Sequence, residues 1–276
     1  MDTDRRHLLC GLSGLVAGTA AAGLVTSVKP AMAAEAPMKR FDQVGGPFGW
    51  TPRKLDIKEV QQAAYEGYYY KGFACGYGAF YAIVGVLAEK YGAPYNQFPF
   101  AMMEAFKGGI ADWGTICGAL GGSALAYALF WGRKERNPMV SELYQWYEST
   151  ALPIYQPADA KVKGDLPQST SDSVLCHISV SRWCYLNKIE ATSKARSERC
   201  GRLTADVAGK AAEIFNAKIE LGKDWKPTLA KPESVENCIA CHKEEGNESN
   251  WAKGRMDCVI CHDGRDAIKN HYENHP

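Results

Sequence analysis

Two copies of one short motif carry the residues with the clearest chemistry in this sequence of 276 residues. The stretches 238–242 (CIACH) and 258–262 (CVICH) lie 20 residues apart near the C-terminus. Two thiols separated by two residues can add to the two vinyl groups of one porphyrin, and the adjacent histidine can then bind its iron. The pattern therefore predicts two covalent c-type haems. The expected anchors are Cys238, Cys241, Cys258 and Cys261, and the expected proximal ligands are His242 and His262.

A structural zinc site is the alternative for the same four thiols. The 16 residues between Cys241 and Cys258 fit the spacing of two CxxC pairs around one ion. Zinc needs no histidine after either pair, however, and the chain has only six histidines. A histidine then falls at a given position with a chance of about 2%. Two such coincidences would be rare, so the pattern favours haem.

The segment that carries both motifs is poor in apolar residues. Of the 53 residues from 224 to 276, only 14 are apolar apart from the motif cysteines, whereas 17 are Asp, Glu, Lys or Arg. Such a composition cannot bury enough apolar area to fold alone. We therefore expect residues 223–276 to form a small module organised by its two porphyrins.

The distal iron ligands are expected from the histidines that follow the motifs. His271 and His275 are four residues apart, so on a helix they would share a face about 6 Å apart. The alternative is that both belong to a frayed polar tail. Met256 lies close to the second motif, but no methionine is better placed than these histidines. Two imidazoles per iron leave no open position, which favours electron transfer over catalysis.

The first 33 residues have the features of an export signal. Arg5 and Arg6 precede an apolar stretch over 8–28, and residues 31–33 form a small-residue cleavage site. The paired arginines favour the twin-arginine route, and an ordinary secretory signal is the alternative. We therefore expect the mature protein to work in the periplasm.

Between residues 56 and 222 the apolar residues follow helical spacing, so we predict an all-α fold with a helical N-terminal domain. Helical segments are expected over 56–92, 99–107, 110–131, 138–148, 173–187 and 193–221. Residues 34–55 would be an N-terminal arm. Prolines mark a loop over 153–171 and a linker near 227–232. The apolar run 115–131 is short for a membrane span, so we expect a buried helix and no membrane anchor in the mature chain.

Five more cysteines lie on the expected inner faces of these helices. They could be small buried hydrophobes, or they could form disulfides, although five is an odd number without a recognisable framework. The third interpretation is an iron–sulfur centre with thiolates from several helices. Cys176 and Cys184 are about 12 Å apart along one helix, so they should not share such a centre. The expected ligands are Cys75, Cys117, Cys176 and Cys200, with Cys184 in reserve.

The charges of the chain are balanced, with 32 Lys and Arg against 31 Asp and Glu. A balanced chain has no field that would attract a polyanion, so nucleic acid is not an expected partner. The motifs favour a periplasmic electron carrier that has no catalytic residues and exchanges electrons with other periplasmic redox proteins. The alternative is a reductase in which one haem or the cluster keeps an open iron site.

Several of these features together closely resemble the split-Soret cytochromes c, which are dihaem proteins of sulfate-reducing bacteria. They are the twin-arginine signal, the Gly- and Cys-rich helical domain and the two terminal CxxCH units. The stretches 73–78 (FACGYG) and 117–122 (CGALGG) are also similar to motifs of a wider family of Cys-containing redox domains. This chain has Ala74-Cys75-Gly76 where that pattern has Gly-Cys-Ala.

The resemblance implies a cofactor content and an assembly. It implies two haem c groups per chain that are stacked in contact, each with two histidines bound to its iron. It also implies a non-haem iron centre such as [2Fe–2S] in the helical domain. It also implies a homodimer whose haems gather near the interface, where one subunit could lend an iron ligand to the other.

Overall fold

Helices provide almost all the regular structure of the chain in the computed structural model, which describes residues 49–239, 242 and 255–260. All of these residues belong to the second of two compact units of the chain, Gly46–Pro276. Among them, strands are limited to one antiparallel pair, β1 (Ala151–Leu152) and β2 (Ser169–Thr170), within and beside the predicted loop 153–171. The predicted helical fold class is confirmed. Its helices are α2 (Ile57–Tyr69), α3 (Ala74–Tyr91), α4 (Gly118–Phe130), α5 (Arg133–Ser149), α6 (Cys176–Asn187), α7 (Lys194–Leu221) and α8 (Glu233–Ile239).

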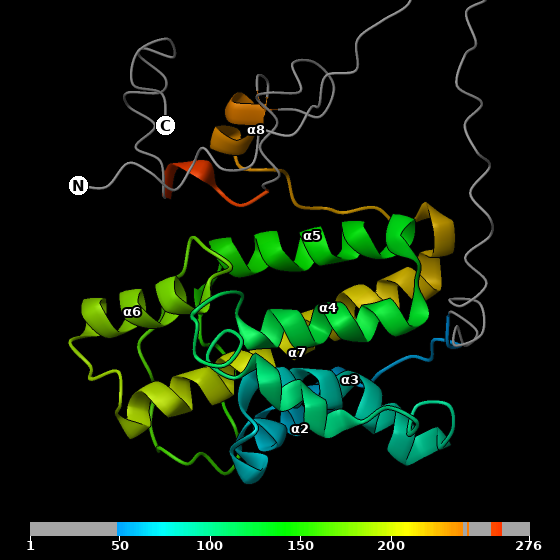
Figure 1. The fold of residues 1–276 in the computed structure, drawn as a ribbon, viewed down its shortest axis with the longest axis horizontal. Coiled ribbons are helices and arrows are strands. Elements are labelled where there is room, and N and C mark those ends of the chain that lie inside the picture. Colours follow the sequence, from blue (N-terminus) through cyan, green and yellow to red (C-terminus); the bar gives the residue numbers. More distant parts are fainter. Residues whose placement is uncertain (1–48, 240–241, 243–254, 261–276) are drawn as a thin grey trace, which may run out of the picture. The chain divides into compact units, whose positions relative to one another are not determined.

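Helix α7 is the element around which the helical domain is built. It has 28 residues and packs against α2, α3, α4 and α5, and Figure 1 shows it running alongside α4 and α5. Its predicted inner stripe is buried from Leu203 through Val207 and Ala211 to Ile214. Burying this apolar stripe is the main stabilising contribution of the helix.

The predicted helical segment 56–92 is two helices with a sharp break between them. Asp56 caps α2 by accepting a hydrogen bond from the backbone N–H of Glu59. The 3-10 turn η1 (Tyr70–Gly72) then ends the helix, because Lys71 and Gly72 have φ angles of 50° and 75°. Right-handed helix cannot continue through two left-handed residues. The chain therefore turns here, and α3 packs back against α2.

Two other predicted boundaries are wrong. Residues 110–117 are not helical: five successive residues from Gly108 to Asp112 have positive φ, and α4 begins only at Gly118. The apolar residues of this stretch suggested a helix from residue 110, whereas the glycines at 108, 109 and 114 are typical of a loop. Helix α5 begins at Arg133 rather than Pro138, which lies inside it. Buried side chains of α5, such as Leu143 and Tyr147, pack against the core and hold the helix across the proline. The short segment expected over 99–107 is the 3-10 helix η2 (Phe100–Phe106).

Glycines let the backbones of α2, α3 and α4 approach very closely. A Cβ atom placed on Gly78 of α3 would lie 2.6 Å from the carbonyl oxygen of Ala64 and 2.8 Å from the backbone nitrogen of Tyr68, both in α2. On the other side, a Cβ on Gly122 of α4 would lie 2.4 Å from the carbonyl oxygen of Gly76. These contacts leave no room for a side chain, so the glycines set the spacing of the three helices.

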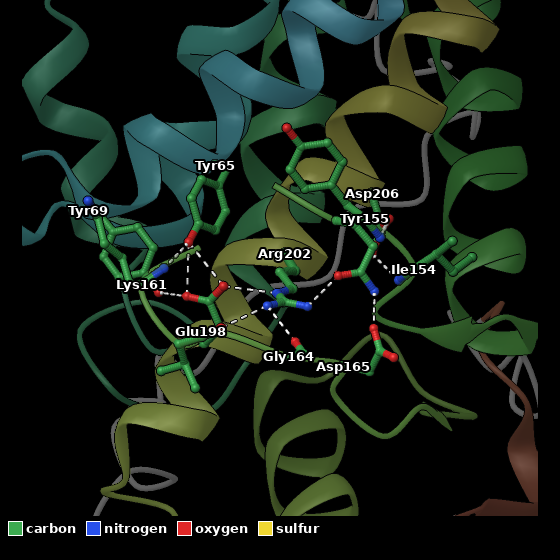
Figure 2. A network of polar contacts seen from close by, with 12 residues as sticks. Tyr65, Tyr69, Ile154, Tyr155, Lys161, Gly164, Asp165, Glu198, Arg202 and Asp206 are labelled. Carbon is green, nitrogen blue, oxygen red and sulfur yellow. Dashed lines mark hydrogen bonds and ion pairs between the residues drawn. The ribbon is translucent and has the colours of Figure 1, made fainter. Parts of the chain in front are cut away.

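A buried polar network ties the loop after β1 to α2 and α7 (Figure 2). The Glu198 carboxylate accepts hydrogen bonds from the hydroxyls of Tyr65 and Tyr69 and from Nε of Arg202. The other guanidinium nitrogens of Arg202 donate to the side chain of Gln156 and to carbonyl oxygens of the loop. Each buried charge of this network is therefore matched, as a buried ion pair requires.

No helix in the described part of the chain is long and apolar enough to cross a membrane. The apolar run 115–131 instead contributes α4 to the core, where Leu120, Ala126 and Tyr127 are fully buried. The expectation of a buried helix at this place is confirmed.

The close approach of α2 and α3 gives a stability prediction. Replacing Gly78→Ala should lower the free energy of unfolding by about 2 kcal/mol, because the added methyl group must push two backbones apart. Gly85→Ala in the same helix is the matched control, since its Cβ would meet only the side-chain ring of Tyr81. Chemical denaturation should show the larger loss at Gly78, and equal midpoints for the two variants would contradict this account.

Candidate functional site

Four of the five cysteines of the helical domain meet in one place, although they come from four different helices. Cys75 belongs to α3, Cys117 precedes α4, Cys176 begins α6 and Cys200 lies in α7. Burial raises the pKa of the Cys75 thiol well above its ordinary value, and negative charge on each of the other three raises it further. The structure thus brings together the four residues that helical spacing had selected.

Cys184 lies at the margin of this group. Burial raises its pKa, and Cys200 is the only other cysteine whose charge contributes. Cys184 lies eight residues beyond Cys176 on α6, which separates the two by about 12 Å along the helix. All five thiols are free, and no disulfide is present among the described cysteines.

Three of the four grouped cysteines lie at helix N-termini. Cys75 is the second residue of α3, Cys117 is the N-cap of α4 and Cys176 is the first residue of α6. The nearby backbone N–H of Ala119 lowers the pKa of Cys117, against the larger effect of burial. Helix N-termini carry a positive partial charge, which favours thiolate and other anions. Sequence reasoning missed this arrangement because it placed Cys117 in the middle of a helix.

Glycines allow the backbone to pack directly against two of the cysteines. A Cβ on Gly118 would lie 2.5 Å from Sγ of Cys75, and a Cβ on Gly109 would lie 2.9 Å from Cβ of Cys176. The loop that contains Gly109 is fixed to the start of α6, because the Cys176 backbone N–H donates to the carbonyl of Thr115 at 2.6 Å. Small residues at these positions are what a thiolate-bound inorganic core requires.

The surroundings of Cys75, Cys117 and Cys176 favour the protonated thiol over the thiolate. Burial is the largest cause, and it raises the pKa of Cys117 as well as that of Cys176, the latter to about 12. A metal ion would have to displace these protons on binding. In the described part of the chain, no three His, Cys, Asp or Glu side chains are arranged to hold a single metal ion.

A buried guanidinium adjoins the cysteine group. Arg199 is only 1% exposed, its Nη2 donates to Oγ of Ser179 at 2.8 Å, and its Nη1 lies 4.0 Å from Sγ of Cys200. Its Nε has no hydrogen-bond partner. Burial opposes the charge of Arg199, but negative charge on Cys200, Tyr147 and Cys117 outweighs it and raises the pKa. The guanidinium and the thiols therefore form one electrostatic site.

The two CxxCH motifs also lie side by side where they are described. Cys238 belongs to α8, and the backbone N–H of His242 donates to the carbonyl of Cys238 at 3.0 Å, so both lie on one helical turn. The second motif begins with the 3-10 turn η5 (Cys258–Ile260). Burial and the thiol of Cys238 raise the pKa of Cys258, which places the first cysteines of the two motifs in contact.

Several predicted haem residues lie outside the described residues. They are Cys241, Cys261, His262, His271 and His275. Met256 is described, and it packs against the helical core. Beside it, the Arg255 guanidinium donates to Oγ of Ser141 in α5 at 2.9 Å.

A cavity of about 430 Å³ lies between α5 and Met256. The carboxyl group of Glu148 lines it, and one oxygen of that carboxyl is buried without a hydrogen-bond partner. Burial, together with the negative charges of Asp257 and Asp172, raises the pKa of Glu148 to about 7. Glu148 therefore holds a proton in the folded chain at a pH where an exposed glutamate has lost it.

This shift predicts a pH-dependent stability. Between the ordinary pKa of 4.5 and about 7 the folded state binds more protons at Glu148 than the unfolded state does. The free energy of unfolding therefore falls as pH rises through this interval. Glu148→Gln should remove this contribution to the pH dependence. The free energy of unfolding of the variant, measured by chemical denaturation, should therefore rise relative to that of the parent chain from pH 5 to pH 8. Parallel curves for the two proteins would contradict it.

The grouped thiols, the helix N-termini and the paired CxxCH motifs define a redox protein of the c-type cytochrome class. The pattern of a family described as a putative redox-active protein, C_GCAxxG_C_C, matches residues 77–214, which is half of the chain. That range contains Cys117, Cys176, Cys184 and Cys200 and begins two residues after Cys75.

Known relatives define the class further. The chain is 64% identical to the split-Soret cytochrome c of Desulfovibrio desulfuricans, and the match covers 100% of both chains. A solved structure, described as showing a novel iron centre in that organism's split-Soret cytochrome c, superposes with a TM-score of 0.79 at 69% identity. It covers 86% of this chain and 100% of the other. The chain belongs to the split-Soret cytochrome c family.

Proposed function

We propose that the protein is a periplasmic electron carrier with two covalent haem c groups and an iron–sulfur centre in its helical domain. The observation that carries the proposal is the meeting of Cys75, Cys117, Cys176 and Cys200 from four helices, in a chain that also has two CxxCH motifs. Each of these sets uses donors that iron cofactors require.

The haem motifs fit their cofactor in the part that is described. Cys238 and His242 lie one helical turn apart, as covalent attachment and iron ligation from the same motif require. When bound, haem supplies a one-electron change between ferric and ferrous iron. The residues that would hold the two haems are Cys238, Cys241, Cys258 and Cys261 as anchors, His242 and His262 as proximal ligands, and His271 and His275 as distal ligands.

The cysteine group fits an iron–sulfur centre on three grounds. Four thiols share one neighbourhood, glycines leave the sulfur atoms accessible to one another, and helix N-termini favour a negatively charged group. The description of the solved relative mentions a novel iron centre, which agrees with this interpretation. Cys75, Cys117, Cys176 and Cys200 would be the ligands of a [2Fe–2S] or other cluster.

The protein itself does three things in this role. It buries Cys75 and Cys117 to 8% and 5% exposure, which excludes water from the thiols. It fixes the loop before Cys117 to the start of α6 through backbone hydrogen bonds. It provides histidines rather than methionine as the expected axial ligands, which keeps haem potentials low.

The N-terminal signal and the family membership bear on location and assembly. Export through the twin-arginine route, signalled by Arg5 and Arg6, would carry a folded domain whose cluster is inserted in the cytoplasm. Haem would be attached afterwards in the periplasm. The protein would be a homodimer with its haems near the interface, and its partners would be other periplasmic redox proteins.

Covalent haem gives the first test. Mass spectrometry of the mature polypeptide should show added mass equal to two haems. The double variant Cys258→Ser and Cys261→Ser should carry only one. A mature chain without added mass would overturn the haem assignment and return the four thiols to the zinc interpretation.

The ligand set gives the second test. Purified protein should contain iron beyond its two haems, together with acid-labile sulfide. Cys200→Ser should lose at least half of both, because one of four ligands is removed. Cys184→Ser is the matched control, since Cys184 lies at the margin of the cysteine group, and it should retain them. Equal retention in both variants would contradict the proposed ligand set.

A further inference from the structure

Arg199 is a buried positive charge with no negative partner among the described residues. Its side chain is 1% exposed in the middle of the domain. The ion pairs of the described chain include Arg182, Arg202 and several lysines, but none involves Arg199. Its Nε has no hydrogen-bond partner at all.

Arg202, one turn further along α7, is a buried arginine that has both a negatively charged partner and hydrogen-bond acceptors. It is equally buried, yet its Nε donates to the Glu198 carboxylate at 2.9 Å and its other nitrogens donate to Gln156 and to two carbonyls. Figure 2 shows this guanidinium surrounded by its acceptors. Two buried arginines on one helix thus differ in that only Arg202 has a counter-charge and a partner for each guanidinium nitrogen.

The contacts that Arg199 does make cannot balance its charge. It donates to the neutral hydroxyl of Ser179 and, at 4.0 Å, to Sγ of Cys200, and its guanidinium carbon lies 6.0 Å from the ring centroid of Trp183. Asp206 feels the charge of Arg199, but its two oxygens accept the backbone N–H groups of Ile154 and Tyr155. A buried charge left without a partner is strongly unfavourable, so a native partner is expected.

One terminal nitrogen of Arg199 faces the cysteine group. Nη1 lies 4.0 Å from Sγ of Cys200. Burial raises the pKa of Cys176 and Cys117, and in both cases the charge of Arg199 partly offsets that rise. Three of the grouped cysteines also lie at helix N-termini, which carry a positive partial charge. The whole site is therefore electropositive.

We infer that Arg199 supplies the fixed positive charge that balances the iron–sulfur centre and raises its reduction potential. This inference rests on the proposed function, because it requires an iron–sulfur centre on the four thiolates. Reduction adds one electron, which the redox partner donates, and so adds one negative charge to the site. A buried positive charge stabilises the reduced state more than the oxidised state. No proton is transferred, since the guanidinium is charged in both states.

Redox titration of the complete, cofactor-loaded protein tests the inference. Arg199→Met should shift the midpoint potential of the iron–sulfur centre to more negative values, as followed by its electron paramagnetic resonance signal. At a fixed potential, the ratio of oxidised to reduced iron–sulfur centres should rise at least tenfold. This corresponds to a midpoint shift of about 59 mV for a one-electron couple. Arg199→Lys, which keeps the charge, should stay close to the parent protein.

Arg196→Met is the matched control on the same helix. Arg196 also lies near Cys200, but it is partly exposed and its Nε donates to the carbonyl of Ala191. Solvent screens its charge, so its loss should shift the potential by less. The haem potentials, measured in the same samples by visible absorbance, should stay unchanged in all three variants.

Each outcome decides between the proposals. Loss of the iron in Arg199→Met but not in Arg199→Lys would support the inference, because it shows that the site needs the charge. An unchanged potential in Arg199→Met with iron retained would overturn it while leaving the proposed function intact. Loss of iron in both Arg199 variants would also overturn it, since packing rather than charge would then matter. Parent protein without non-haem iron would overturn both proposals.

Discussion

The close contact of the α2, α3 and α4 backbones is the constraint on which the rest of this structure depends. Glycines at 78 and 122 allow a spacing that no other residue permits, because a Cβ at either of them would enter the backbone of a neighbouring helix. This spacing brings the start of α3 against the start of α4. Cys75 and Cys117 become neighbours as a direct result, and Gly118 leaves room between them.

The direction of the helices then gives this group of thiols a preference for negative charge. Three helices begin at the cysteines, and α7 contributes Cys200 together with the adjacent Arg199. Partial charges at helix ends act in the same sense as a buried guanidinium. The domain therefore offers its thiols a positive surrounding without using a single lysine. Charge preference here is a property of the backbone arrangement as much as of side chains.

Sequence alone was sufficient for the fold class. The choice of Cys75, Cys117, Cys176 and Cys200 as cluster ligands stays a prediction. The sequence could not show that Cys117 caps a helix, because an apolar run has the same composition before and after a helix start. The break at Lys71 and the early start of α5 were missed for a similar reason: tertiary packing outweighs local preference there. The unbalanced charge of Arg199 was also invisible, because pairing depends on which elements meet in space.

The unpaired guanidinium of Arg199 on α7 has a consequence for the stability of the polypeptide before its metal is inserted. A chain that lacks its metal would keep a dry, uncompensated cation at the centre of the domain, so its native state would compete less well with unfolded forms. Insertion of the metal and folding of the domain would then each favour the other. A quality check that senses only exposed apolar surface would separate filled chains from empty ones, with no need to recognise iron.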